Sequence, residues 1–258
     1  MVDQVGKEKA CGRALAETRL SHPDPFRTLL PIDQQGQLPS LVRQLRRRGS
    51  ILAQTRRLLA EGGYGGFSLR QVSERSEVTA QTIYNSFGTK QELLIAALNE
   101  YNAAVYGRVK QEDEGLLAFL GVNAKFYESA LTAPDFMREY ICSLYVAGDV
   151  KGGVYRHSRK LISSIMLSVV NAGVLRSGVD ADALGQTSFR VRASAMYSWA
   201  VGHIDHKELR SELLSSNAYL LLGALRPSPA KELEWFMESK AGQIYLSGPG
   251  AAVESSFS

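Results

Sequence analysis

The sequence predicts an all-α protein. From residue 41 onward, apolar residues recur at spacings of three and four, as they do on one face of a helix. No run of alternating β-branched or aromatic residues is long enough to build a sheet. Serine or threonine followed three residues later by glutamine or glutamate marks two helix starts, and glycines mark helix ends.

The composition is that of a globular protein. The 258 residues are 45% apolar and 22% charged, which suffices for one or two cores. The longest apolar runs, such as Tyr219 to Leu225, fall far short of the roughly 18 to 20 residues of a membrane span, and the first residues are polar, unlike a signal peptide. We therefore expect a cytoplasmic protein. Cys11 and Cys142 have no CxxC spacing, so structural roles are favoured over a disulfide framework or a zinc site.

Positive charge is concentrated in one segment. Residues 1–40 carry five Lys or Arg and five Asp or Glu, residues 41–90 carry nine and three, and residues 91–258 carry sixteen and eighteen. The excess in residues 41–90 favours contact with a polyanion. A solvated basic helix face is the alternative.

The first forty residues are predicted to form an irregular arm, because they hold half of the chain's prolines: Pro23, Pro25, Pro31 and Pro39. A helix is expected from Leu45 to Glu61 and ended by Gly62 and Gly63. Its apolar face consists of Ile51, Leu52, Thr55, Leu58 and Leu59, and its arginines are expected on the other faces: Arg46, Arg47, Arg48, Arg56 and Arg57.

Two short helices are predicted next. Ser68 with Gln71 forms the capping box of the first, and Thr79 caps the second, which buries Ile83 and Phe87. The turn between them spans residues 76–78. Gly88 ends the second helix, and the residues from Thr89 to Glu92 form the capping box of a longer helix that runs through Tyr101.

Two short helices joined by a tight turn form a helix-turn-helix, which places its second helix in the major groove of DNA. The exposed side of that helix is short and polar. Gln81 and Asn85 fit base reading, because amides hydrogen-bond adenine well. The residues that fit phosphate contact are Thr79, Thr82, Tyr84 and Lys90.

Residues 64–73 and 78–94 together resemble the signature of the tetracycline-repressor (TetR) family. The resemblance implies that Tyr84 and Lys90 contact the DNA backbone, that Phe87 packs the head, and that residues 79–85 present the reading face. The full predicted DNA-binding set is Arg70, Thr79, Ala80, Gln81, Thr82, Tyr84, Asn85 and Lys90.

Two positions depart from the family pattern. Glu77 stands where the family usually has glycine, and it requires an adjusted turn because a Cβ resists positive φ. Ser86 stands where an aromatic residue or histidine is common. A small three-helix bundle without DNA affinity is the alternative interpretation of the predicted helix-turn-helix region.

The region after Tyr101 is predicted to be a helical regulatory body, with breaks near Asp113, Pro134, residues 148–153, residues 177–179 and His206. Residues 171–182 resemble the junction before the last two body helices of TetR-like proteins. Those helices, about 182–202 and 209–225, are expected to pair with their copies in a homodimer, because residues 213–225 are more apolar than one packed face requires.

The resemblance also implies an inducer, a small apolar or aromatic molecule, bound in the body. The residues predicted to line its site are Phe119, Phe126, Tyr127, Tyr140, Tyr145, Met166, Met196 and Trp199. Each of them could equally be ordinary core.

His203 and His206 have the spacing of metal ligands, but the segment reads as a helix end and no further ligand lies nearby, so no metal is predicted. Ser228 and Pro229 predict the start of a further helix that carries Leu233, Phe236 and Met237.

The predicted domains are an arm at 1–40, a DNA-binding head at 41–95, a ligand-binding and dimerisation body at 96–246 and a mobile tail at 247–258. The predicted function is that of a transcriptional regulator, a repressor that binds a palindromic operator as a homodimer and is released by the inducer. No cofactor and no membrane partner are expected.

The chain lacks the phosphate-loop, GxSxG and HExxH motifs of enzymes, so catalysis is not predicted. An enzyme or a helical interaction module without DNA binding is the alternative.

Overall fold

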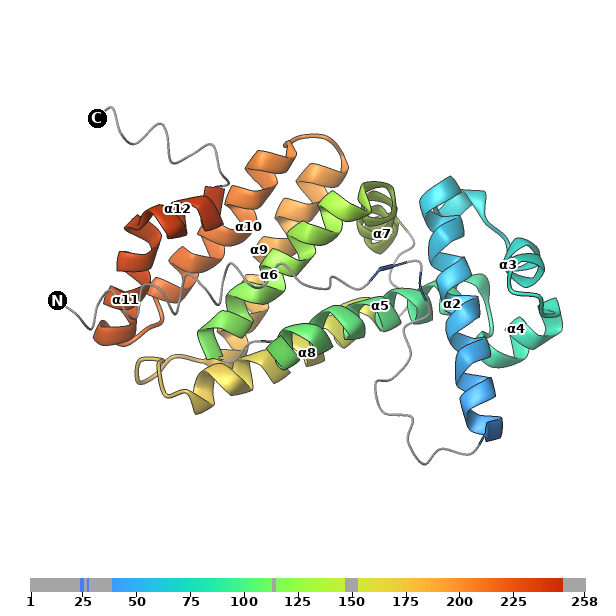
Figure 1. Ribbon diagram of the computed structural model, residues 1–258, viewed down its shortest axis with the longest axis horizontal. Coiled ribbons are helices and arrows are strands. Elements are labelled where there is room, and N and C mark those ends of the chain that lie inside the picture. Colours follow the sequence, from blue (N-terminus) through green and yellow to red (C-terminus); the bar gives the residue numbers. More distant parts are fainter. Residues whose placement is uncertain (1–23, 26, 28–38, 113–114, 147–152, 248–258) are drawn as a thin grey trace. The chain divides into compact units, whose positions relative to one another are not determined.

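The chain folds into helices, as predicted. The computed structural model describes residues 24–25, 27, 39–112, 115–146 and 153–247, and within them the sole β-pairing is a single bridge between Leu175 and Leu225 (Figure 1). The helices are α2 (Pro39–Gly66), α3 (Leu69–Arg75), α4 (Ala80–Phe87), α5 (Lys90–Glu112), α6 (Gly115–Thr132), α7 (Pro134–Val146), α8 (Gly153–Asn171), α9 (Ala181–Ala200), α10 (His206–Leu222), α11 (Pro227–Glu238) and α12 (Lys240–Ser247).

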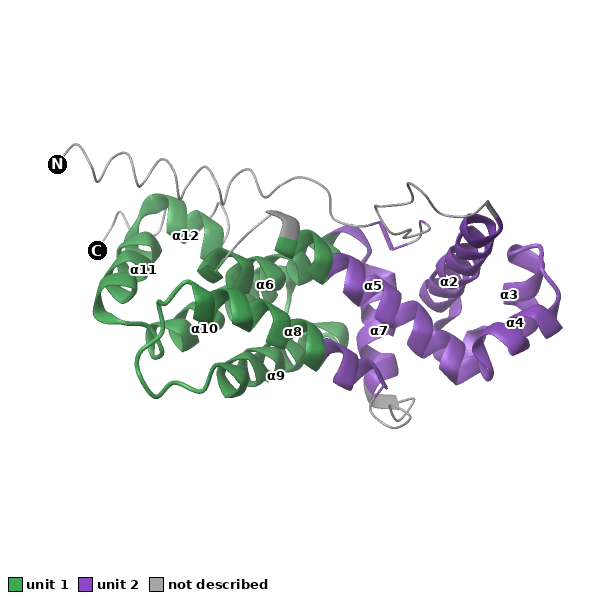
Figure 2. Cartoon of the chain, turned by 90° about the horizontal axis from the view of Figure 1, so that it is seen from below, with its two compact units in different colours: residues 1–22, 106–131, 159–258 green, residues 23–105, 132–158 purple. Residues whose placement is uncertain are grey.

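The chain divides into two compact units (Figure 2). Unit 2 comprises residues 23–105 and 132–158, and unit 1 comprises residues 1–22, 106–131 and 159–258. The predicted boundary between residues 95 and 96 stays a prediction, and α5 is continuous across it. Most of the predicted arm and tail lies outside the described residues.

In unit 2, α2 begins near the predicted start of the ordered chain, and its helical geometry breaks at Gly63, whose φ is 65°. Ile51, Leu52 and Leu59 are buried as predicted. Arg56 was expected at the surface, but it is fully buried. Its guanidinium donates hydrogen bonds to the carboxylate of Glu100 at 2.7 Å and to the carbonyl oxygen of Ala97 at 3.1 Å.

Helices α5 and α7 meet in unit 2 through aromatic side chains. The rings of Tyr101 and Phe136 pack edge to face at 5.1 Å between centroids. The Tyr140 hydroxyl donates to the Asn102 side chain at 2.9 Å, and the Asn102 amide donates to Ser158 of α8 at 3.2 Å. These hydrogen bonds satisfy polar groups that would otherwise be costly to bury.

In unit 1, α9 and α10 pack together through a buried hydrogen bond from Ser188 to Asn217, 2.6 Å long. Asp180 caps α9. Asp205 and Glu208 form a capping box at the start of α10, so His206 is the first residue of a helix. The prediction that residues 203–206 form the C-terminal end of a helix was wrong for His206, because Asp205 caps α10 directly before it.

The C-terminal helices α11 and α12 pack against α10. The predicted helix carrying Leu233, Phe236 and Met237 is present, and all three side chains are buried. It starts at Pro227, two residues before the predicted proline, because Arg226 already has extended backbone geometry there. Helices α9, α11 and α12 all contact α10. Leu213, Leu214 and Leu221 of α10 are buried within the single chain, whereas Tyr219 of the same helix is 64% exposed.

None of the helices in the described ranges combines the length and the apolar character that crossing a membrane requires.

Candidate nucleic-acid interface

The predicted helix-turn-helix is formed by α3 and α4 (Figure 1). The Ser68 hydroxyl accepts from the Gln71 amide at 3.3 Å, and the Gln71 side chain accepts from the Ser68 amide at 2.8 Å, which confirms the capping box. The Thr79 hydroxyl accepts from the Thr82 amide at 3.1 Å and caps α4. Ser68 and Thr79, from which the two helix starts were predicted, therefore cap α3 and α4 in the structure.

The turn between the helices adopts the strained geometry expected at Glu77. Its φ is 54°, and among the described residues it is the sole non-glycine residue with positive φ. The amide of Val78 donates to the carbonyl of Ser73 at 3.1 Å, which closes the turn. The family's usual glycine would adopt this conformation without a Cβ penalty.

Helix α4 presents one buried and one exposed face. Ile83 is fully buried and Phe87 is 9% exposed, while Gln81 and Asn85 lie at the surface. The Gln81 amide donates to the Asn85 side-chain oxygen at 2.7 Å, so the two candidate base readers already lie side by side. Four residues of spacing on a helix produce this pairing.

The remaining predicted residues of the head lie around this face. Tyr84 is 60% exposed, Ala80 is exposed and Thr82 is half-buried. Arg70 is exposed on α3 and forms an ion pair with Glu74 at 2.9 Å.

Lys90 differs from these exposed side chains. Its ammonium donates to the carbonyl oxygen of Tyr64 at 2.6 Å and lies 4.7 Å and 4.4 Å from the ring centroids of Tyr64 and Phe67. Partial burial lowers the pKa of Lys90. The side chain therefore ties the start of α5 to the segment after α2.

The predicted DNA-binding set omitted cations on the first turns of α2. Arg43, Arg46 and Arg47 are exposed there. The next residue, Arg48, places its guanidinium carbon 4.4 Å from the ring centroid of Phe87, at the end of α4. The sequence shows the local excess of arginine. The contact between Arg48 and Phe87 adds that the start of α2 lies beside the end of α4, the candidate reading helix.

The predicted inducer-lining residues are packed side chains. Phe119, Phe126, Tyr127, Met166, Met196 and Trp199 are buried in unit 1, and Tyr140 is buried in unit 2. The side chain of Tyr145 lies outside the described residues. Their role as ligand contacts stays a prediction.

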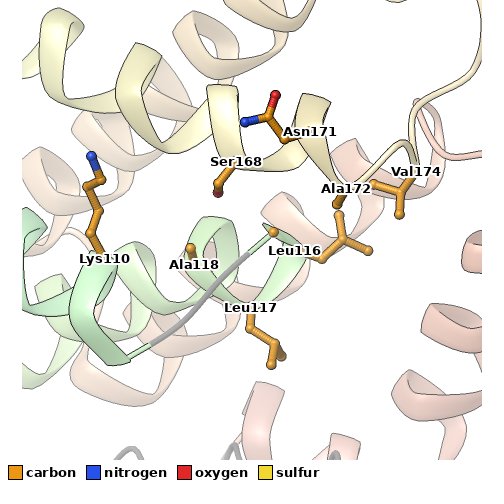
Figure 3. A pocket seen from close by; sticks show the side chains of 9 residues that line it. Lys110, Leu116, Leu117, Ala118, Ser168, Asn171, Ala172 and Val174 are labelled. Atoms are coloured by element: carbon orange, nitrogen blue, oxygen red, sulfur yellow. The ribbon is translucent and has the colours of Figure 1, made fainter.

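Unit 1 also contains a cavity of about 640 Å³, lined by none of those residues (Figure 3). It lies where α5 ends, α6 begins and α8 ends, and its lining residues are Lys110, Gly115, Leu116, Leu117, Ala118, Ser168, Asn171, Ala172 and Val174. Its walls are largely apolar, with the amine of Lys110 and the amide of Asn171 at its edge (Figure 3).

Sequence comparison places the head in a known family. Residues 51–97 match the family model described as "Bacterial regulatory proteins, tetR family". Over 55 residues the chain is 42% identical to the HTH-type transcriptional repressor KstR of Rhodococcus jostii (strain RHA1), a match that covers 21% of this chain and 26% of KstR. The chain thus spans about a quarter of the length of this curated relative.

The fold extends the similarity beyond the head. A protein from Rhodococcus sp. described as a TetR-family transcriptional regulator superposes with a TM-score of 0.56 at 20% identity, over 67% of this chain and 97% of its own. SmeT, the repressor of the Stenotrophomonas maltophilia multidrug efflux pump SmeDEF, superposes with a TM-score of 0.52 at 16% identity, over 70% and 91%. The head thus matches the TetR family in sequence over residues 51–97, and the all-helical fold resembles a solved structure described as a TetR-family regulator.

Proposed function

We propose that this protein is a transcriptional repressor that reads DNA with the exposed face of α4. The observation that carries the proposal is the pairing of Gln81 with Asn85 on an exposed polar face, above a buried face anchored by Ile83. A helix of this kind fits the major groove, where the side-chain amide of Asn or Gln recognises adenine through two hydrogen bonds. KstR and SmeT, by their names, are repressors, which supports the same assignment.

The exposed arginines of α2 extend the proposed surface. Arg43, Arg46 and Arg47 would meet phosphates beside the end of α4, and Tyr84 would meet them along its length. Each phosphate neutralised by a cation releases counterions, so affinity depends steeply on salt. Lys90 is assigned a supporting role, because its ammonium is bonded within the head.

Selection of bound sites from a pool of random duplexes tests the proposal with the full chain. A palindromic consensus is expected, because two-fold symmetric regulators read two half-sites. Gln81→Ala and Asn85→Ala should relax preference at defined positions by about 1–3 kcal/mol. Ser228→Ala, an exposed change on α11, should leave preference unaltered. A chain that selects no sequence at low salt would instead favour an enzyme or an interaction module.

The proposed repressor acts as a homodimer through α9 and α10. Tyr197 and Val201 lie one turn apart at the end of α9 and are 37% and 40% exposed, and Tyr219 on α10 is 64% exposed. Apolar side chains of this size at the surface favour association. Tyr219→Glu should yield a monomer by light scattering, while Trp235→Glu on α11 should leave the dimer intact. A wild-type monomer at micromolar concentration contradicts the proposal.

Release from DNA is proposed to follow binding of a small molecule in unit 1. The ligand would favour a conformation of the dimer whose heads no longer match the half-site spacing. Such a ligand raises the dissociation constant for the operator and leaves dimer affinity nearly unchanged. Anisotropy of a labelled selected duplex measures the first, and analytical ultracentrifugation measures the second.

A further inference from the structure

A cation with no carboxylate partner among the described residues lies in the core of unit 1. Arg192, near the middle of α9, is 3% exposed. Its guanidinium donates to the Asn123 side-chain oxygen at 3.3 Å and to the hydroxyl of Tyr106. Three aromatic rings surround it, with the guanidinium carbon 4.7 Å from the centroid of Phe126, 5.4 Å from that of Phe189 and 5.7 Å from that of Tyr106.

Neither hydrogen-bond acceptor supplies negative charge. Asn123 is a neutral amide, and burial raises the pKa of Tyr106 despite the opposing effect of Arg192, so the phenol stays protonated. Across the described part of the chain, no carboxylate forms an ion pair with Arg192. Aromatic faces offset part of the desolvation of a guanidinium, but they do not neutralise it.

The other two cations that are buried in the described ranges have carboxylate partners. Arg56 pairs with Glu100 at 2.7 Å, and Lys125 pairs with Glu128 at 3.4 Å. An unpaired buried charge is costly, and such departures concentrate at functional sites. Among the described residues Arg192 therefore differs from Arg56 and Lys125, and its donors are available to an anionic ligand.

The surroundings of Arg192 indicate the chemistry of that partner. Asn123 and Tyr106 engage two of the five N–H groups of the guanidinium, which leaves donors for the two oxygens of a carboxylate. The rings of Phe126, Phe189 and Tyr106 surround these donors. A ligand with one acidic group on an apolar body matches both features.

The cavity of unit 1 lies along the same two helices. Lys110 and Leu116 both line it (Figure 3). Lys110 is one turn beyond Tyr106 on α5, and Leu116 is two turns before Asn123 on α6. Phe119 lies between Leu116 and Asn123 in the sequence of α6, and its side chain is fully buried. Arg192 and Phe119 do not line this cavity, so a ligand whose apolar body occupies it reaches Arg192 only if the packed side chains between them move.

We propose that Arg192 binds the carboxylate of the effector, and that the effector is an apolar monocarboxylic acid. This proposal rests on the effector-controlled repression proposed above. The bound acid supplies the missing negative charge to the core of unit 1. The neutral amide or alcohol of the same skeleton leaves Arg192 unpaired and binds weakly.

The test uses the full chain and matched pairs of probes: octanoate, decanoate, dodecanoate and 4-phenylbutyrate, each against its primary amide. Titration calorimetry is expected to show at least one acid binding at least tenfold more tightly than its amide. Arg192→Met should abolish that preference, Arg192→Lys should retain part of it, and Arg190→Met, an exposed change on the same helix, should retain it fully.

Stability provides a readout that does not depend on DNA. Circular dichroism first establishes that each variant is folded. The acids should raise the melting temperature of the wild type and of Arg190→Met but not that of Arg192→Met. Equal binding of acids and amides, unchanged acid binding by Arg192→Met, or no binding by any acid of the panel overturns the proposal.

Failure of the repressor assignment gives a different pattern. If the chain binds acids through Arg192 but selects no DNA, the repressor function fails and the acid site stands. If the chain selects a palindrome but the acids neither bind nor release the duplex, the acid site fails and the repressor function stands.

Discussion

The ammonium of Lys90 donates to the main-chain carbonyl of Tyr64 at 2.6 Å and lies between two aromatic rings. The bond joins the first residue of α5 to Tyr64, which follows the break of α2 at Gly63. It therefore connects the two helices that come before and after α3 and α4 in the sequence. A charged donor bonded in this way stabilises a fold more than an exposed lysine does.

Lys90→Met is therefore expected to destabilise the protein by about 1–3 kcal/mol, because a charge-assisted hydrogen bond and the ring contacts are lost. Chemical denaturation measures this loss. The slope of log affinity for the selected duplex against log salt should not change, whereas Arg46→Met should reduce it by about 0.9. A reduced slope for Lys90→Met would instead support the phosphate contact implied by the family resemblance.

The pair formed by Arg56 and Glu100 gives a second prediction. Arg56→Met should lower the free energy of unfolding by about 3–5 kcal/mol, because Glu100 would be left mostly buried and unpaired. Arg57→Met, one residue along and exposed, should change it by less than about 0.5 kcal/mol. Urea denaturation at pH 7 compares the two, and similar values for both variants would argue against the buried pair.

The penalty of Arg56→Met should depend on pH. Burial raises the pKa of Glu100, and loss of the neighbouring guanidinium would raise it further. Because the folded-state pKa then lies above the unfolded value, the folded state binds the proton more tightly and recovers stability as pH falls. The difference between variant and wild type should shrink from pH 7 to about pH 4.5, near the unfolded pKa of glutamate. A penalty that grows over this range would contradict the assignment.

The helix-turn-helix could be predicted from sequence because local rules determine it. Ser68, Thr79 and Thr89 cap helices through bonds to residues three positions away, and these bonds depend on the adjacent sequence alone. The strain at Glu77 was expected from the family resemblance, because Glu77 stands where the family usually has glycine.

What could not be predicted depends on contacts between distant segments. Arg56 looked like a surface residue, since its partner Glu100 is 44 positions away. Lys90 looked free, since the carbonyl that binds it belongs to Tyr64. The cage around Arg192 joins three helices far apart in sequence, so hydrophobic periodicity cannot reveal it.

Gly242 permits the close packing of α12 on α11. A Cβ at this position would collide with the carbonyl of Phe236, and main-chain atoms cannot simply rotate away. Gly242→Ala should therefore destabilise the protein by about 1–3 kcal/mol, the usual cost of overpacking. Gly107→Ala is the matched control, because no atom lies near its added Cβ and alanine stabilises a helix interior by about 0.5–1 kcal/mol. Thermal unfolding of both variants should show shifts of opposite sign.

Cys142 should be a slow nucleophile. Its thiol is half-buried on α7, and burial raises its pKa, with Glu139 adding to the effect and Arg138 opposing it. Because the thiolate is the reactive species, alkylation by iodoacetamide at neutral pH should be slower than that of free glutathione. The experiment uses Cys11→Ser, which leaves Cys142 as the single cysteine. The rate should keep rising with pH beyond about 8.5, the pKa of an unperturbed thiol, and a plateau below that pH would show a lowered pKa instead.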